Sequence, residues 1–206
     1  EGLNTGGMGT VAPNPYYTPA VAERCMQEIF LPTVAAMQAE GCPFKGCLYF
    51  GLMLTPDGPK VIEYNCRFGD PETQVVLPLL ESDLLTVMEA TTNGTLDKTD
   101  VKFSDGAAAC VILASGGYPL AYEKGKEITG LTAGQLDAAD VTVYHAGTAI
   151  KDGRLVTNGG RVLGVTATAN TLPEALKKAY AATESIHFDK LHKRSDIGAR
   201  ALAAMQ

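Results

Sequence analysis

The 206-residue sequence predicts an α+β fold with antiparallel sheets, and three observations carry this prediction. Apolar residues recur at helical spacing in residues 19–40, and two strand patterns flank a Pro-Asp-Gly turn in residues 45–64. Beyond a polar stretch at residues 97–105, strand patterns dominate the sequence. We therefore expect two units: residues 1–102, in which helices accompany an antiparallel sheet, and a small strand-rich α+β domain in residues 103–206.

Capping and turn residues place the helices and strands along the chain. Thr18, Ser82 and Thr171 each stand directly before a run at helical spacing and are expected to cap it, and Pro32 should kink the first helix. The expected helices cover residues 19–40, 70–80, 83–92 and 173–186. The expected strands cover residues 45–54, 59–64, 107–114, 141–149 and 161–168.

Charge and composition exclude several classes of protein. The formal net charge of -6 argues against a partner bound through the nucleic-acid backbone. No window approaches 18 uninterrupted apolar residues, so we expect no membrane span. The five cysteines are scattered without a C-x-x-C pair, which favours free thiols in the reducing cytoplasm. The first residues form no secretory signal, but the chain does not begin with Met and is read as a fragment.

A pair of oxygen-bearing side chains ends the second strand of the expected hairpin. Glu63 and Asn65 are two residues apart, so they point to the same face of a strand. A carboxylate beside an amide oxygen suits Mg²⁺, which takes its other ligands from water and phosphate. A solvated strand face is the alternative interpretation. Three charged residues follow directly and favour a site; they are Arg67, Asp70 and Glu72.

Two further segments could contact an anion. The loop that contains Gly6, Gly7 and Gly9 lacks side chains where main-chain N–H groups could approach a ligand, although a plain turn has the same composition. Arg161 follows an Asn-Gly-Gly turn and could reach a phosphate, although a surface arginine in a hairpin is the simpler reading. These glycines and Arg161 are the candidate substrate-binding residues.

Several of these segments resemble the phosphoribosylamine–glycine ligase family. The resemblance begins with the string Asn-Thr-Gly-Gly-Met-Gly at residues 4–9 and continues through residues 44–54. Its most specific part is the string at residues 62–74, which contains Asn-Cys-Arg-Phe-Gly-Asp-Pro-Glu-Thr-Gln. Residues 159–163 and 194–198 resemble the carboxyl-terminal domain of the same family. The resemblance follows the order of the family along essentially the whole chain.

The resemblance implies an ATP-grasp fold and a ligase reaction. Residues 1–102 would be the carboxyl-terminal part of the ATP-grasp domain, and residues 103–206 the carboxyl-terminal domain of the enzyme. ATP, glycine and 5-phosphoribosylamine would give glycinamide ribonucleotide, ADP and phosphate in purine biosynthesis, through a glycyl phosphate. Glu63 and Asn65 match the family's ligands for Mg²⁺ or Mn²⁺. Arg67, Asp70 and Glu72 are the catalytic candidates.

Two features limit what this chain could do alone. Many ATP-grasp enzymes carry another acidic ligand on the strand that pairs with Glu63, whereas residues 46–54 contain none. The family's amino-terminal half is absent from the sequence, so we expect this polypeptide to bind ATP weakly and to catalyse nothing. The alternatives left open are another ATP-grasp carboxylate–amine ligase, a subunit of a purine-pathway carboxylase, and a non-catalytic scaffold that retains the fold.

Overall fold

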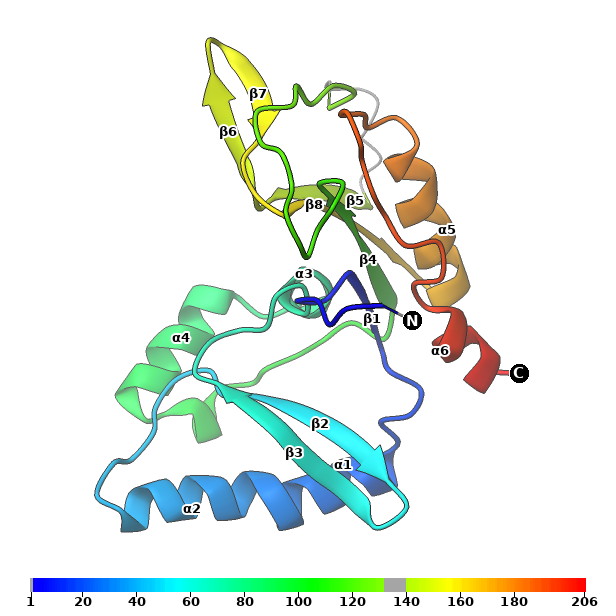
Figure 1. Ribbon diagram of the computed structural model, residues 1–206. Coiled ribbons are helices and arrows are strands. Elements are labelled where there is room, and N and C mark those ends of the chain that lie inside the picture. Colours follow the sequence, from blue (N-terminus) through cyan, green and yellow to red (C-terminus); the bar gives the residue numbers. More distant parts are fainter. Residues whose placement is uncertain (1, 132–139) are drawn as a thin grey trace. The chain divides into compact units, whose positions relative to one another are not determined.

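The structure, a computed structural model, describes residues 2–131 and 140–206 (Figure 1). The chain divides into two compact units that interleave along the sequence. The sheet unit comprises Glu1–Pro13, Asp70–Leu79 and Ser104–Gln206, and the hairpin unit comprises Asn14–Gly69 and Leu80–Phe103. The sequence led us to expect one boundary near residue 102, whereas each compact unit contains more than one segment of the chain. The boundary between the domains stays a prediction, since spatial compactness alone does not define a domain.

Four antiparallel strands form the sheet of the sheet unit, in the order β1-β4-β8-β5. The central pair, β4 (Ala107–Ala114) and β8 (Arg161–Ala169), confirms two of the predicted strands. The edge strand β1 (Gly9–Ala12) was not predicted, because four residues behind a glycine loop show no alternation of their own. Strand β5 (Val141–His145) forms the other edge.

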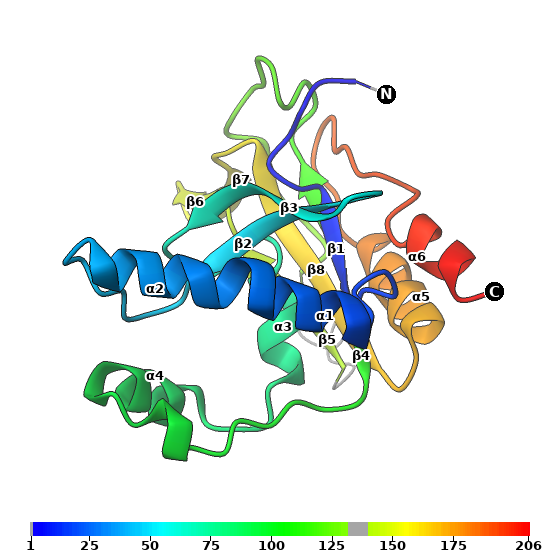
Figure 2. The same ribbon diagram turned by 90° about the horizontal axis from the view of Figure 1, so that it is seen from below.

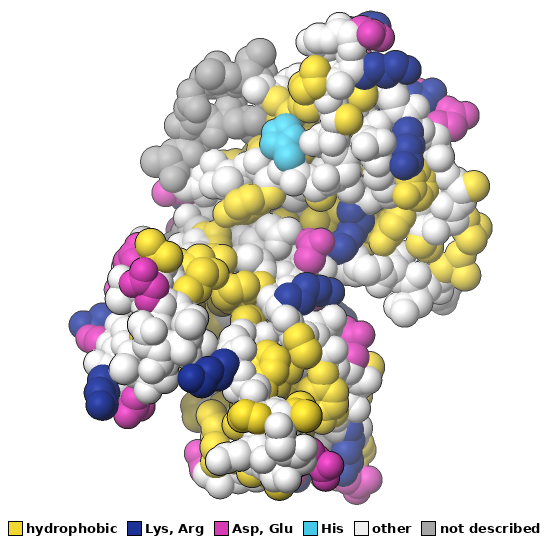
Figure 3. Space-filling view, turned by 90° about the vertical axis from the view of Figure 1, so that its left-hand side faces the viewer, with side chains coloured by type: hydrophobic (Ala, Val, Ile, Leu, Met, Phe, Trp, Pro, Cys, Tyr) yellow, Lys and Arg dark blue, Asp and Glu magenta, His cyan; other side chains and the backbone are white. Residues whose placement is uncertain are grey.

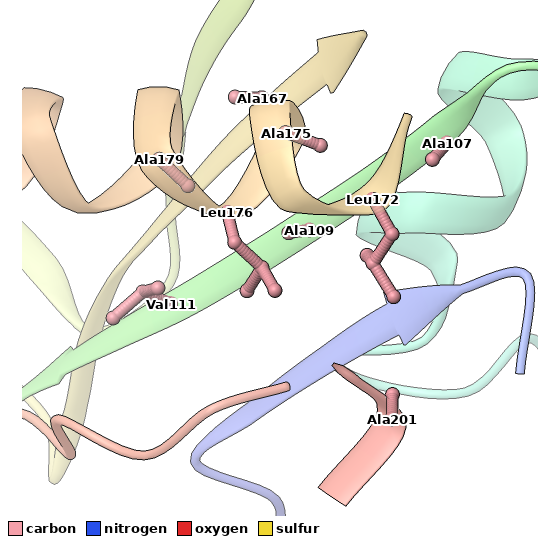
Figure 4. Close-up of a cluster of buried hydrophobic side chains, with 9 residues drawn as sticks. All are labelled: Ala107, Ala109, Val111, Ala167, Leu172, Ala175, Leu176, Ala179 and Ala201. Carbon is pink, nitrogen blue, oxygen red and sulfur yellow. The ribbon is translucent and has the colours of Figure 1, made fainter. Parts of the chain in front are cut away.

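Strand β4 is buried along its whole length and supplies both faces of the core. Ala107, Ala109 and Val111 face helix α5 (Leu172–Thr183), which packs on the sheet together with α6 (Ala199–Ala204) (Figure 4). The alternate residues of β4 face the short helix α3 (Thr73–Val76) and Met8. This period of two explains the uninterrupted apolar sequence of β4, since both faces of the strand are covered.

One predicted strand is wrong, and three elements were not anticipated. Residues 141–149 form two strands, β5 and β6 (Thr148–Lys151), because the chain turns at Gly147. A Cβ at Gly147 would lie 2.6 Å from the Cα of Gly159, so the two main chains meet there. Strand β6 then pairs with β7 (Arg154–Thr157), which the sequence pattern missed together with β1 and α6. The predicted cap of α5 is confirmed, since Thr171 Oγ1 accepts from the Glu174 N–H.

In the hairpin unit, a long helical run lies beside the hairpin of β2 (Tyr49–Thr55) and β3 (Gly58–Asn65) (Figures 1 and 2). Helix α1 (Pro19–Cys25) begins at the predicted cap Thr18 and continues through a π-helical turn, Met26–Phe30, into α2 (Leu31–Ala39). This turn ends two residues before Pro32 and contains Glu28, whose carbonyl lies four residues before Pro32, a residue with no N–H to donate. Phe30 packs against Phe50 of β2, with ring centroids 4.5 Å apart.

The second helix of the hairpin unit corrects one predicted cap. Helix α4 (Leu84–Asn93) is capped by Asp83, whose Oδ2 accepts from the Thr86 N–H at 2.7 Å. Ser82 was expected in this role, but its hydroxyl accepts from the Lys102 N–H at 2.8 Å. Gly94, at φ 69°, ends the helix as expected. Among the residues that the structure describes, no helix is long and apolar enough to cross a membrane.

Candidate functional site

The first group of predicted site residues lies at the end of β3 in the hairpin unit. Asn65 Nδ2 donates a hydrogen bond to Glu63 Oε1 at 3.1 Å, so the two side chains share one face of the strand, as their spacing predicts. The Glu63 side chain is exposed and Asn65 is half-buried. The pair therefore presents a carboxylate and an amide to solvent at the point where the strand ends.

The strand opposite this pair leaves room for the carboxylate. Gly51 of β2 is the register partner of Glu63, and the pairing shifts between Gly51 and Leu52. A Cβ at Gly51 would lie 2.8 Å from Glu63 Cγ, so the Glu63 side chain crosses bare main chain. A residue with a side chain at position 51 would have to displace the carboxylate. The glycine is thus part of the geometry that brings Glu63 to Asn65.

The donor set of the pair suits a hard divalent cation that keeps much of its hydration. Within residues 2–131 and 140–206, no three His, Cys, Asp or Glu side chains are grouped as metal ligands. One carboxylate and one amide oxygen leave most positions of an octahedral ion to water and phosphate oxygens, which is how Mg²⁺ is usually bound beside nucleotides. The residues present therefore fit a hydrated divalent cation.

Arg67 follows the pair in the loop after β3. Its Nη1 donates to the carbonyl oxygen of Phe68 at 2.7 Å, and its side chain is exposed. This bond uses one of the five N–H donors of the guanidinium, and the side chain remains exposed. The arrangement holds one edge of the guanidinium against the loop and keeps a cation at the end of the hairpin.

Exposed apolar side chains are common on the hairpin that carries this polar pair. Ile62 and Tyr64 alternate with the pair along β3 and are 62% and 52% exposed, and Met53 of β2 is 54% exposed. Figure 3 shows hydrophobic side chains grouped at the surface of its lower part, which belongs to this unit. The polar pair is therefore a local exception on a hairpin with much exposed apolar surface.

The second group of predicted residues meets in the sheet unit around Arg161. Its Nη1 donates to the carbonyl oxygens of Asp70 at 2.9 Å and Gly7 at 3.3 Å, and its Nη2 donates to Asp70 Oδ2 at 2.9 Å. The other carboxylate oxygen of Asp70 accepts from Gln74 Nε2 at 2.9 Å. The Arg161 side chain is 21% exposed, so it joins three segments of the chain at the edge of the core.

The loop glycines differ in what their surroundings require. Gly7 has φ 42°, and a Cβ there would lie 2.6 Å from Pro71 Cδ. A Cβ at Gly9 would lie 2.8 Å from the carbonyl oxygen of Cys110 on the neighbouring strand. A Cβ at Gly6 would meet its nearest atoms at 3.5 Å, which is an ordinary contact. Packing therefore demands glycine at positions 7 and 9 and permits a methyl group at position 6.

The structure thus brings the predicted residues together in two groups that belong to different units. Glu63, Asn65 and Arg67 form one, and the glycine loop, Asp70 and Arg161 form the other. Glu72 lies next to Asp70, where its carbonyl oxygen accepts from Val75 and Val76 and so begins α3. What each residue does remains a prediction.

The sequence pattern missed one residue of the second group. Tyr118 was assigned only to a turn, yet its hydroxyl accepts from the Gly6 N–H at 3.1 Å. The available signal was an aromatic hydroxyl between two glycines and a proline, which is a sharply constrained place for a large side chain. The contact joins residues 112 positions apart, so no local pattern could have identified the partner.

Burial makes the thiol nearest this group unreactive. Cys110 is fully buried in β4, and burial raises the pKa of its thiol to about 11, with a further rise from Asp70 and opposing effects from Thr166 and Arg161. Because the thiolate is the nucleophilic form, Cys110 is neutral and inert at pH 7. The chemistry of the second group must therefore come from its charged and main-chain groups.

Comparisons with known proteins match both parts of the chain to one family. The model "Phosphoribosylglycinamide synthetase, ATP-grasp (A) domain" matches residues 1–73, and "Phosphoribosylglycinamide synthetase, C domain" matches residues 108–200. A phosphoribosylamine–glycine ligase of Vibrio vulnificus (strain YJ016) is 50% identical over 206 residues, which are 100% of this chain and 48% of that protein. The chain spans about half the length of the curated relatives it matches.

Solved structures show the same fold. The crystal structure of phosphoribosylamine–glycine ligase from Thermotoga maritima has a TM-score of 0.83 and 41% identity, covering 96% of this chain and 48% of that one. The biotin carboxylase subunit of pyruvate carboxylase has a TM-score of 0.61 at 16% identity, covering 97% of this chain and 47% of its own, and supports the fold alone. The predicted α+β fold of ATP-grasp type is confirmed.

Proposed function

The chain belongs to the phosphoribosylamine–glycine ligase family, and from this premise we propose that it is the carboxyl-terminal half of such an enzyme. The complete enzyme would join glycine to 5-phosphoribosylamine with ATP, giving glycinamide ribonucleotide, ADP and phosphate in purine biosynthesis. Its partners would be these substrates and the amino-terminal half of the same protein. We also propose a cytoplasmic location, with which the five free thiols agree.

The observation that carries the proposal is the shared face of Glu63 and Asn65. Their hydrogen bond at 3.1 Å places a carboxylate and an amide side by side, inside the segment that matches the ATP-grasp domain. They would hold Mg²⁺ or Mn²⁺, which when bound neutralises charge on the phosphates of ATP. A scaffold that had lost catalysis would have no chemical need for this pair.

The other residues would position and neutralise the reactants. Arg67 presents an exposed guanidinium in the loop that follows the pair, where it would bind the glycine carboxylate as this attacks the γ-phosphate. The amine of phosphoribosylamine would then attack the carbonyl carbon of the resulting glycyl phosphate, which forms the amide bond and releases phosphate. Asp70 and Glu72 would accept hydrogen bonds or a proton from that amine. No side chain of the protein needs to act as a nucleophile, because orientation and charge neutralisation carry such a reaction.

The glycine loop and Arg161 would bind an anionic part of a substrate. The Arg161 guanidinium already contacts Gly7 and Asp70, so its first effect would be to hold the loop in one conformation. Main-chain N–H groups of a fixed glycine loop can then receive a carboxylate or phosphate oxygen without reorganisation. Gly6, Gly7 and Gly9 would form this surface, although the Gly6 N–H itself donates to Tyr118.

The test is phosphate release by a full-length ligase that carries this chain as its carboxyl-terminal half. We expect release to require Mg²⁺, ATP, glycine and phosphoribosylamine together, with glycinamide ribonucleotide as the product. Release that needs a different carboxylate or amine would instead indicate another ATP-grasp ligase. The isolated 206-residue chain should release no phosphate under the same conditions, and full activity of the isolated chain would refute the proposed division.

A further inference from the structure

The hydroxyl of Tyr118 contacts the main chain of the glycine loop at a defined point. It accepts from the Gly6 N–H at 3.1 Å. The atoms nearest to a Cβ built at Gly6 are Tyr118 Oη and Arg161 Cζ, both at 3.5 Å. The phenol and the guanidinium therefore flank the same glycine, although they belong to segments more than 40 residues apart in the sequence.

The ring of Tyr118 is itself held in place. A Cβ at Gly160 would lie 2.2 Å from Tyr118 Cδ2, so the ring packs directly on bare main chain. The Tyr122 ring lies 6.3 Å from it between centroids. Ser115 ties this segment to the same turn, since its N–H donates to the Gly160 carbonyl and its hydroxyl to the Gly159 carbonyl, both at 2.8 Å.

Tyr118 and Arg161 together fix one peptide group of the loop. Tyr118 takes the N–H of Gly6, and Arg161 takes the carbonyl oxygen of Gly7 at 3.3 Å. The peptide between these two anchors contains the Gly7 N–H, so its direction is set from both sides. A main-chain N–H with a fixed direction is the group that such a loop offers to an anion.

We propose that Tyr118 is a positioning residue of the glycine loop, which acts through Gly6 to orient the loop toward an anionic oxygen of a substrate. The proposal rests on the proposed function and adds to it a residue from the carboxyl-terminal segment. The oxygen belongs either to the carboxylate of glycine or to the phosphate of phosphoribosylamine. Both offer the same chemistry to an N–H donor, and the kinetic experiment distinguishes them.

The first test measures how firmly Tyr118 holds the Gly6 N–H, and it does not depend on enzyme activity. In the 206-residue chain, Tyr118→Phe removes the acceptor and keeps the ring on Gly160, so hydrogen exchange of the Gly6 amide should become about five- to tenfold faster. Tyr122→Phe is the matched control, because it removes a neighbouring hydroxyl and should leave the exchange of Gly6 within twofold. Unchanged protection of Gly6 in the Tyr118→Phe variant would overturn the proposal.

The second test measures initial rates of the full-length ligase. Tyr118→Phe should raise the KM for glycine or for phosphoribosylamine about fivefold or more, while the KM for ATP stays within twofold and Tyr122→Phe changes neither. A rise in all three KM values, or a fall in kcat alone, would mark a merely structural role and overturn the proposal. A wild-type enzyme that makes no glycinamide ribonucleotide would refute the proposed function instead. The exchange experiment would still test whether Tyr118 holds the Gly6 N–H.

Discussion

The two groups of candidate residues are built in opposite ways. In the hairpin unit, Glu63 and Asn65 come from one strand, and the sequence spacing alone places them on one face. In the sheet unit, Tyr118 and Arg161 hold the glycine loop, and Asp70 from a third segment pairs with Arg161. A local pattern therefore suffices to find the first group, whereas the second exists only after the sheet has formed.

This difference also separates chemistry from stability. Glu63 and Arg67 are exposed, so changing them should alter function and leave the fold intact. Arg161 and Gly7 are packed against other segments, so changing them should affect the fold first. Each prediction below tests this separation, beginning with the largest expected effect.

Glu63→Gln should abolish most of the ligase activity. The amide retains an oxygen that can accept from Asn65, but it removes the negative charge that a divalent cation requires. We expect kcat/KM of the full-length enzyme to fall at least about 100-fold, equal to about 2.7 kcal/mol of lost transition-state stabilisation.

The control for this variant is Glu40→Gln, which neutralises an exposed carboxylate at the end of α2. Its activity should stay within twofold of the wild type. Both variants should keep the wild-type midpoint of urea unfolding. A Glu63→Gln enzyme with normal activity would remove the basis for the proposed metal site.

Gly7→Ala should destabilise the fold far more than Gly6→Ala. At position 7 the added methyl group meets Pro71 Cδ at 2.6 Å and the residue must keep φ at 42°. Left-handed backbone costs about 1–2 kcal/mol without glycine, and overpacking adds about 1–3 kcal/mol. We expect the free energy of unfolding to fall by about 2–5 kcal/mol for Gly7→Ala and by less than about 0.5 kcal/mol for Gly6→Ala.

Urea unfolding of the two variants measures this difference directly. Equal losses at positions 6 and 7 would show that the loop adopts another conformation in solution. If Gly6→Ala folds normally but weakens substrate binding in the full-length enzyme, the bare surface at position 6 serves the ligand. The pair would then separate the two reasons for glycine within one loop.

The same contrast explains which parts of the fold were predictable. Strand β4 follows from a continuous apolar run, and the β2–β3 hairpin follows from two strand patterns around a turn signal. Thr18 and Thr171 are caps with clear local signatures. Strand β1 could not be predicted, because four residues gain their strand structure only by pairing with β4. Residues 141–149 were read as one strand because the break at Gly147 depends on contact with Gly159.

The site shows the same limit. The interpretation of Glu63 and Asn65 needed only strand periodicity, and the structure places both side chains on one face. The role of Tyr118 was invisible, since nothing near position 118 refers to Gly6. Sequence reasoning thus finds residues whose partners lie one or two positions away. It misses those whose partners come from a distant segment of the chain.

Arg161→Lys should weaken the sheet unit by an intermediate amount. The guanidinium contacts the carbonyl oxygen of Gly7 and both the carbonyl oxygen and Oδ2 of Asp70. A lysine ammonium cannot span all three oxygens. Losing one or two of these hydrogen bonds in a mostly buried position should lower the free energy of unfolding by about 1–2 kcal/mol. Urea unfolding at low ionic strength measures this loss.

Arg154→Lys is the matched control for this substitution. Its side chain is 62% exposed and pairs with Glu127 at 3.3 Å, so the change should stay within about 0.5 kcal/mol. Equal effects at positions 161 and 154 would contradict the view that Arg161 joins three segments. The stability difference between the wild type and Arg161→Lys should persist in high salt, because partly buried pairs are weakly screened. A difference that disappears in high salt would also contradict this view.

The smallest expected effect concerns the thiol buried in β4. The pKa of Cys110 is raised to about 11 by burial, whereas an unfolded cysteine titrates near about 8.5. Between these values the unfolded chain has lost the proton and the folded chain keeps it, so unfolding releases a proton and stability falls as pH rises. Below about pH 8.5 the contribution of this thiol to stability is fully present.

Comparison of the wild type with Cys110→Ala isolates this contribution. The urea midpoint of the wild type should fall more steeply than that of the variant between pH 8.5 and about 10.5, and the extra slope should vanish in the variant.

Thiol labelling at pH 7.5 should modify the exposed Cys42 and Cys66 first and should reach Cys25 and Cys110 only in urea. Rapid labelling of Cys110 in the folded chain would mean that β4 opens locally. The glycine loop, which Arg161 contacts at Gly7, would then be less rigid than this hydrogen bond implies.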